Sequence, residues 1–352
     1  MTQKKDILSL SGEELLKEIE ALGERSFRAK QIFKWLHRVG VTDFSLMQDL
    51  SLPLRSKLEE SFYITKLLEL RRQTSSDGTI KFLFQLEDGN TLESVLMTHS
   101  YGSSLCVSTQ VGCRMGCKFC ASTLGSKVRD LTAGEILSQV YTASALTGRK
   151  IDKLVLMGMG EPLDNYNNVM KFLKIINDEN GLNMSHRHIS LSTCGIVPRI
   201  YKLADEDLQL TLSISLHAAN NEERSRIMPV NNAFNIEELM GAARYYFKKT
   251  HRRISYEYAL IEGVNDSLKN AEELAALLKG QGCHINLIPV NPVKETGFLK
   301  TNREQTERFR EALIKAGFSA TVRKEMGGEI DAACGQLRQR AGEEDNLRKG
   351  EN

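Results

Sequence analysis

The sequence predicts an α/β protein built around a partial, TIM-like (β/α)6 barrel, with a small helical domain ahead of it. From about residue 100 to residue 325, short apolar runs alternate with stretches of helical periodicity. This alternation indicates parallel strands joined by right-handed helical crossovers. About six such units are present, fewer than the eight of a closed barrel. We therefore expect an open barrel with its functional residues on the loops that follow the strands.

The expected strands are the apolar runs, taken in chain order. They are SLCVSTQVG, KLVLMGMGEP, HISLSTCG, LTLSISLHA, RISYEYALIEG and HINLIPVNP, with a shorter SATVRKEMG near the end. The helical stretches between them include AGEILSQVYTASALTG, NYNNVMKFLKIINDENG, NIEELMGAARYYFKK and REQTERFREALIKAG. Candidate site motifs directly follow several of the apolar runs, where a barrel places its active site.

The chain ahead of the barrel divides into a helical part and a strand-like part. Ser11 and Glu14 form a capping box before the first helical stretch. From Tyr63 to Met97 the pattern alternates as in strands, around a hairpin signal at Asp88-Gly89. We expect four segments: a helical accessory domain at 1–62, a strand-rich extension at 63–98, the barrel at 99–340 and a charged flexible tail at 341–352.

The charges of the 352 residues nearly balance, with 47 basic against 45 acidic side chains and a net charge of +2. Such a chain has no general attraction to polyanions, so any nucleic-acid site must be a local patch. The start is polar, and no apolar stretch is long enough to span a bilayer. We expect a cytoplasmic protein without a signal peptide or membrane contact.

Three of the seven cysteines are crowded into a C-x3-C-x2-C motif after the first expected barrel strand. They are Cys113, Cys117 and Cys120. Thiolates are the usual ligands of [4Fe–4S] clusters, and three ligands would leave one iron open to an outside group. A zinc site needs four ligands, and no nearby Cys or His pair supplies the fourth. The motif therefore predicts an iron–sulfur cluster.

This spacing, with an aromatic residue before the last cysteine, resembles the signature of radical S-adenosylmethionine (SAM) enzymes. The resemblance implies a radical SAM type of partial barrel, in which the open iron binds the methionine part of SAM. The string GMGEP resembles the superfamily's element for the methionine amino group, which implies that Gly160 and Glu161 bind SAM. Taken alone, the string would be a glycine-rich turn at a strand end.

Longer strings resemble one family within this superfamily, the RlmN/Cfr RNA methyltransferases, and RlmN more closely than Cfr. They are QVGCRMGCKFCAS, GMGEPLDN, LSTCGIVP, SLHAANNEERSRIMPVN, NLIPVNP and IDAACGQL. The resemblance implies methylation of adenine C2 in the peptidyl-transferase region of 23S rRNA and in the anticodon loop of tRNA. It also implies a flavodoxin or ferredoxin as electron donor.

The resemblance further implies a covalent pathway through two cysteines. Cys334 takes a methyl group from one SAM, and a second SAM yields a 5′-deoxyadenosyl radical that removes hydrogen from it. The methylene radical then adds to C2 and forms an enzyme–RNA adduct. Attack of Cys106 on the Cys334 sulfur releases methyladenine and leaves a transient disulfide. Glu93 matches the family's proposed base for the C2 proton.

The remaining SAM contacts implied by the resemblance are Ser192, Ser215, Leu216, His217 and Asn291. Each such residue has an ordinary structural reading as well. Cys106 lies in an apolar strand, where a free cysteine is usually a small core residue. A lone strand glutamate such as Glu93 is usually on a solvated face. We take Cys194 and Cys283 as core cysteines.

The helical accessory domain carries a basic stretch with two aromatic residues, Phe27 and Trp35. The basic residues are Arg25, Arg28, Lys30, Lys34, His37 and Arg38. This stretch predicts an RNA-binding surface. A solvated helix face over a core of those aromatic residues is an equally good interpretation.

Two alternatives stay open. The first is a Cfr-type enzyme that methylates adenine C8. The second, from another class, is a non-catalytic iron–sulfur protein that binds RNA or transfers electrons. Such a protein would have no use for Cys334 or for the Gly-Glu element, which counts against it.

Overall fold

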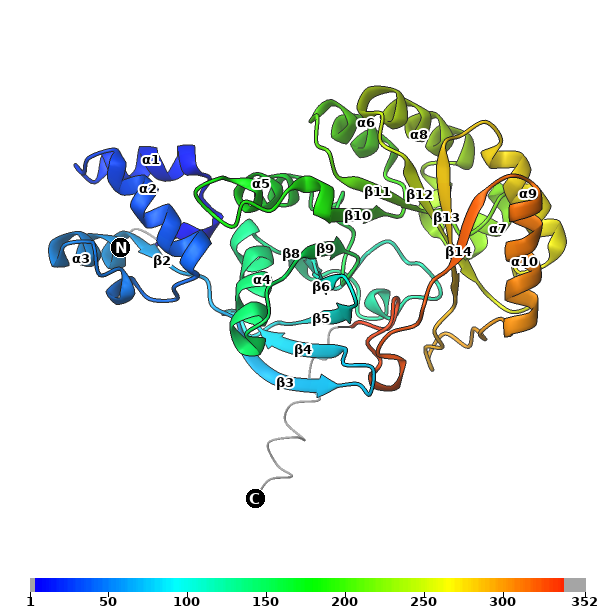
Figure 1. The fold of residues 1–352 in the computed structure, drawn as a ribbon, viewed down its shortest axis with the longest axis horizontal. Coiled ribbons are helices and arrows are strands. Elements are labelled where there is room, and N and C mark those ends of the chain that lie inside the picture. The colour runs from blue at the N-terminus through cyan, green and yellow to red at the C-terminus, as the bar shows by residue number, and fades with distance from the viewer. Residues whose placement is uncertain (1–3, 339–352) are drawn as a thin grey trace, which may run out of the picture.

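The computed structural model describes residues 4–338, so the expected charged tail lies outside the described residues. A ten-stranded sheet runs through the molecule in the order β14-β13-β12-β11-β10-β9-β6-β5-β4-β3 (Figure 1). Its strands are β3 (Leu68–Thr74), β4 (Ile80–Gln85), β5 (Thr91–His99), β6 (Gly102–Cys106), β9 (Lys153–Leu156), β10 (Ile189–Thr193), β11 (Thr211–Ser215), β12 (Ile254–Leu260), β13 (Cys283–Pro289) and β14 (Ser319–Val322).

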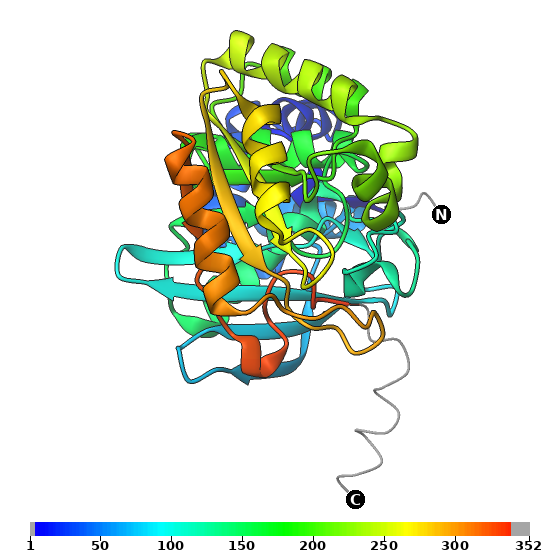
Figure 2. The same cartoon turned by 90° about the vertical axis from the view of Figure 1, so that its right-hand side faces the viewer.

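Along the sheet from β6 through β9, β10, β11, β12 and β13 to β14, each strand is parallel to the next. Helices join them in six strand–helix units, which confirms the predicted (β/α)6 barrel. The helices are α4 (Ala133–Thr147), α5 (Tyr166–Asn177), α6 (Val197–Asp205), α7 (Asn221–Ile227), α8 (Ile236–Thr250), α9 (Leu268–Leu278) and α10 (Arg303–Lys315). Helices α9 and α10 lie side by side on the outside (Figure 2). Since β3 and β14 are the two edges of the sheet, the barrel is open.

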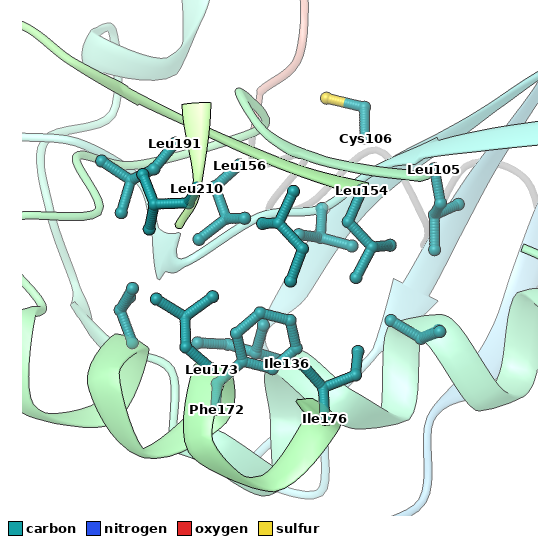
Figure 3. Packing of buried hydrophobic residues seen from close by; sticks show 14 of the residues in the cluster. Leu105, Cys106, Ile136, Leu154, Leu156, Phe172, Leu173, Ile176, Leu191 and Leu210 are labelled. Atoms are coloured by element: carbon teal, nitrogen blue, oxygen red, sulfur yellow. The ribbon is translucent and has the colours of Figure 1, made fainter. Parts of the chain in front are cut away.

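The core lies between the outer face of the parallel strands and the helices. Figure 3 shows leucines of the sheet, such as Leu105, Leu154 and Leu156, pointing toward Phe172 and other apolar residues of α4 and α5. Cys106 follows Leu105 in β6 and points to the opposite side (Figure 3). Successive strand residues face opposite sides of a sheet. Each parallel strand therefore presents one face to the helices and the other to the barrel interior.

Strands β3, β4 and β5 extend this sheet as an antiparallel meander. The predicted hairpin is confirmed, because β4 and β5 pair in register from Gln85 and Thr91 on either side of Asp88-Gly89. Strand β5 then pairs with β6. The segment expected as a separate extension at 63–98 is thus continuous with the barrel sheet.

The segment after β14 runs back across the open side of the barrel to this meander (Figure 1). Glu329 accepts hydrogen bonds from Ser75 Oγ at 2.6 Å and from the Ser76 amide. The amide of Gly327 donates to Asp77, and Lys81 donates to the carbonyl of Asp331. These contacts fasten the chain that carries Cys334 to the β3–β4 turn and to β4.

The N-terminal helices pack beside α4 and α5 (Figure 1). They are α1 (Gly12–Ala21), with the predicted Ser11–Glu14 capping box, α2 (Phe27–Lys34), which continues into a π-helical turn (Trp35–Val39), and α3 (Leu52–Ser61). A short parallel pair joins β1 (Lys5–Asp6) to β2 (Phe62–Tyr63). Lys171 of α5 binds Glu14 at 2.8 Å.

One basic residue of the expected RNA surface is not on the surface. His37 is buried, and its Nδ1 lies 2.8 Å from the hydroxyl of Tyr141 in α4. The expectation that His37 adds to an exposed basic patch is therefore wrong, because the residue joins the N-terminal helices to the barrel. Phe27 is 46% exposed, so it is not the core aromatic of the alternative interpretation either.

No helix among residues 4–338 combines the length and the apolar character needed to cross a bilayer.

Burial lowers the pKa of His37 to about 3, whereas an unfolded histidine titrates near 6.5. The unfolded chain therefore binds a proton that the folded chain does not. We expect the free energy of unfolding to fall as the pH drops below about 6.5, by up to about 1.4 kcal/mol per pH unit for this group. Denaturant titrations at several pH values should show a shallower fall for His37→Gln. His251→Asn, at an exposed position, is the control, and an equal slope in His37→Gln and wild type would contradict the assignment.

The backbone conformation just before Cys113 depends on Gly112, which has a φ of +73°. A Cβ atom there would lie 1.8 Å from the carbonyl oxygen of Ser126. We expect Gly112→Ala to lower the free energy of unfolding by at least about 2 kcal/mol, because the positive φ alone costs roughly 1–2 kcal/mol. Gly125→Ala is the matched control, since a Cβ atom there meets nothing within 4 Å. Equal unfolding free energies for the two variants would count against this role.

Candidate active site

Two adjoining cavities occupy the inside of the barrel. The larger, of about 590 Å³, runs along the inner face of the strands, and we call it the barrel cavity. The smaller, of about 160 Å³, lies at the carboxyl ends of the strands, and we call it the cysteine cavity. Both are lined by Met157, Glu257, Ile288, Asn291, Arg323 and Cys334.

Cys113, Cys117 and Cys120 all line the cysteine cavity. They lie on a loop between the short strands β7 (Gln110–Val111) and β8 (Arg129–Asp130), which pair with each other. Burial raises the pKa of the Cys113 thiol to about 12 and also raises those of Cys117 and Cys120. A bound cation would offset the free-energy cost of ionising these buried thiols.

The donor set fits a cluster better than a single ion. Among the described residues, no three His, Cys, Asp or Glu side chains are grouped so that they could hold one metal ion. In a [4Fe–4S] cluster each thiolate binds a different iron, so the sulfur atoms need not converge on one point. Cys113, Cys117 and Cys120, which all line one cavity, are compatible with that requirement.

The loop after β9 passes close to the cysteine loop. Gly160 has a φ of +99°, and a Cβ atom there would lie 2.5 Å from the Cβ of Gln110. The buried carboxylate of Glu161 accepts backbone hydrogen bonds from Leu163 at 3.0 Å and from Cys194 at 2.7 Å. Burial raises the pKa of Glu161. Glu161 therefore joins the loops that follow β9 and β10, and it lines the cavity as well.

Most of the other predicted SAM contacts also line this cavity. Ser192 and Ser215, at the ends of β10 and β11, have hydroxyl oxygens 3.4 Å apart. His217 accepts a hydrogen bond from the Ala259 amide through Nδ1 at 2.9 Å. Burial lowers the pKa of His217 to about 3, so its ring is neutral and its proton is on Nε2. Leu216 does not line the cavity, since its side chain is fully buried.

Cys106 and Cys334 meet at the barrel cavity, although they lie far apart in the sequence. Both are free thiols. Burial, followed by the nearby Cys334, raises the pKa of Cys106 to about 12. Asn291 donates to the carbonyl of Cys334 at 3.0 Å, and the next carbonyl, of Gly335, accepts from Ala121 beside the cysteine motif. Cys334 is thus held where the two cavities join.

Arg323 is a site residue that the sequence analysis missed. It follows β14 directly and lines both cavities. The neighbouring Cys334 contributes most to the raised pKa of the Arg323 guanidinium, and Glu257 and Cys106 raise it further. Its position just after an apolar run, SATV, was the signal that could have identified it.

Arg224 is a second residue that the sequence analysis missed. It binds backbone carbonyls of loops beside the cysteine cavity. Its fully buried guanidinium donates to the carbonyls of Cys194 at 2.6 Å and Leu216 at 3.1 Å. Cys194, expected to be a core residue, is buried but also lines the cysteine cavity. Cys283 is half-buried at the start of β13 and lines neither cavity.

Glu93 is not on a solvated face, contrary to the ordinary reading of a strand glutamate. It is buried in β5, 3.5 Å from the Lys81 ammonium. Its Oε2 accepts a hydrogen bond from the Arg338 amide at 3.0 Å. Glu93 lines neither cavity, but it contacts the C-terminal segment that carries Cys334.

Two family models match this chain. Residues 5–64 match the ribosomal RNA large subunit methyltransferase N-terminal domain, and residues 107–278 match the radical SAM superfamily. The chain is 54% identical to a probable dual-specificity RNA methyltransferase RlmN of Clostridium novyi, over 95% of this chain and 98% of the relative. It is 52% identical to the protein of the same description from Staphylococcus saprophyticus, over 96% and 93%.

The fold has a close counterpart among solved structures. A radical SAM methyltransferase from Sphaerobacter thermophilus superposes with a TM-score of 0.91 at 43% identity, over 95% of this chain and 99% of that one. The similarity therefore extends over the helical domain, the meander and the barrel together. On these grounds the chain belongs to the RlmN family of radical SAM RNA methyltransferases.

Proposed function

We propose that this chain methylates C2 of adenine in the peptidyl-transferase region of 23S rRNA and in the anticodon loop of tRNA. The observation that carries the proposal is that Cys106 and Cys334 line one cavity, beside a second cavity that Cys113, Cys117 and Cys120 line. A non-catalytic iron–sulfur protein would not need two free thiols brought together in this way. We place the reaction in the cytoplasm, where a disulfide between them would be transient.

The cysteine cavity would hold both cofactors. Cys113, Cys117 and Cys120 would bind one [4Fe–4S] cluster. SAM, used twice per turnover, would contact Gly160, Glu161, Ser192, Ser215, Leu216, His217 and Asn291, with Leu216 limited to its backbone. When bound, these groups supply a methyl group and a radical that removes a hydrogen atom, with electrons from a flavodoxin or ferredoxin.

Cys334 would act as the carbon carrier. Adenine C2 lies between two ring nitrogens and is electron-poor, so it does not attack a methyl donor itself. A thiolate is intrinsically nucleophilic, and Cys334 lies close enough to the Arg323 guanidinium to raise the pKa of that guanidinium. Because Cys334 lines both cavities, its sulfur can take a methyl group in one and present the carbon to a base in the other.

Cys106 would release the product. Its thiolate attacks the Cys334 sulfur, an S–S bond forms, and the bond from that sulfur to the transferred carbon breaks. The electron pair of the broken bond stays with the carbon, which takes a proton from water to become the methyl group, and reduction of the disulfide restores both thiols. Arg323 lies near both sulfur atoms and would also favour the Cys106 thiolate, whose pKa burial raises to about 12.

Glu93 remains our proposal for the base that removes the C2 proton. It lies on β5, the strand that pairs with β6 and Cys106. Its contact with the Arg338 amide ties it to the segment of Cys334.

The two cysteines should fail differently when replaced. Cys334→Ala lacks the carbon carrier, so it should form no adduct with RNA. Cys106→Ala should form the adduct and then stall, so that RNA stays attached after denaturation and shows on a gel and by mass spectrometry. Cys283→Ala, which changes a cysteine outside both cavities, is the control and should turn over like wild type. Normal turnover by Cys106→Ala would contradict the proposed disulfide step.

The methylated carbon can be identified with labelled substrate. RNA that carries deuterium at adenine C2 should lose it to solvent during methylation, whereas a C8 label should stay in place. Mass spectrometry of the digested product measures both labels. Loss of the C8 label with retention of the C2 label would make this a Cfr-type enzyme.

A further inference from the structure

The barrel cavity reaches the surface at the amino ends of the strands, away from the cysteine cavity. The residues there are Tyr101 in the β5–β6 turn, Lys153 at the start of β9, and Arg187 and His188 just before β10. All four are exposed. We call this surface, together with His99, the barrel mouth.

The barrel cavity is strongly biased toward positive charge, although the chain as a whole is nearly neutral. Its lining includes five lysines or arginines against two glutamates, Glu257 and Glu325. Lys300 pairs with Glu325. Lys153 and Arg187 are the exposed cations of the mouth, and Lys324 is a further exposed cation of the cavity lining. Burial and the nearby Lys153, Arg323 and Lys324 lower the pKa of His99, as expected in a positive field.

The aromatic rings of His99 and Tyr101 stack on each other close to these cations. The rings of His99 and Tyr101 are 4.8 Å apart and only 7° from parallel. The Lys153 ammonium lies 4.1 Å from the Tyr101 ring centre. Tyr101 is nevertheless 63% exposed, so part of its ring surface remains open to solvent. The mouth therefore combines a stacking group with cations, which is the pattern that binds single-stranded nucleic acid.

We propose that the barrel mouth binds the single-stranded RNA that flanks the target adenine. Tyr101 stacks on a neighbouring base, Lys153 and Arg187 bind phosphates, and the target adenine passes through the barrel cavity to Cys334. An adenine in RNA structure must leave its stack to reach a buried site. The mouth residues line the same cavity as Cys106 and Cys334. This inference rests on the proposed function and adds the entry route of the substrate.

An acidic electron-transfer protein is the other macromolecule that a basic surface could bind. Its electrons would have to reach Cys113, Cys117 and Cys120, which line the other cavity. The stacked Tyr101 would also have no role in such a contact. These two observations favour RNA at the mouth.

The test uses an RNA stem-loop that carries the target adenine in its loop. Its dissociation constant is measured for the wild-type enzyme and for variants, all loaded with the cluster. Tyr101→Ala should raise Kd about 5- to 150-fold without changing its salt dependence. Tyr101→Phe keeps the ring and should bind like wild type. Lys153→Gln/Arg187→Gln should reduce the slope of log Kd against log salt concentration by about 1.4, or roughly 0.7 for each lost phosphate contact.

Arg244→Gln/Lys248→Gln is the matched control, because it removes two exposed cations from the outer helix α8 and should leave affinity and slope unchanged. Thermal unfolding of each variant establishes that it folds. Wild-type affinity and slope in the mouth variants, with methylation by the wild type intact, would overturn the entry route and leave the proposed function standing. Unchanged RNA affinity with slower cluster reduction by flavodoxin would assign the mouth to the reductant instead. Failure of the wild type to bind or methylate the stem-loop would overturn both proposals.

Discussion

The alternation of side chains along the parallel strands is the constraint on which the site depends. In β6, Leu105 packs against the helices while Cys106 faces the interior (Figure 3). The same alternation places Lys153, Val155 and Met157 of the β9 region on the barrel cavity. A shift of one residue in strand register would exchange these two sets. The leucine core that stabilises the barrel therefore also determines which residues can meet the substrate.

The interior face is polar in a way that a closed core could not tolerate. Buried polar groups need partners, and here they find one another across neighbouring strands. Glu257 of β12 accepts from Ser255 and from Asn286 of the adjacent strand β13. Arg224 holds a buried positive charge beside backbone carbonyls, and the half-buried Arg323 holds another near the thiols of Cys106 and Cys334. Such groups are costly to bury, so their concentration around one pair of cavities marks a site shaped for ligands.

The open side of the barrel explains how distant parts of the chain share one site. The segment after β14 crosses from one sheet edge to the meander at the other and is fastened there through Ser75, Asp77 and Lys81. This crossing carries Cys334 to Cys106. The N-terminal helices pack outside, against α4 and α5, and line neither of the two cavities. A role for their basic residues in RNA binding would therefore lie outside the base-binding cavity.

The sequence by itself determined the class of fold and the cofactor chemistry. Strand–helix alternation, the Asp88-Gly89 hairpin and the cysteine spacing are local patterns. Such patterns can be recognised in the sequence without information about long-range contacts. The tertiary structure decided the rest. Three features depend on segments that are distant in the sequence. They are the burial of His37, the position of Arg323 near two cysteines, and the position of Glu93 outside both cavities. No periodicity reports such contacts, because they arise only when the C-terminal segment and the helices pack against the sheet.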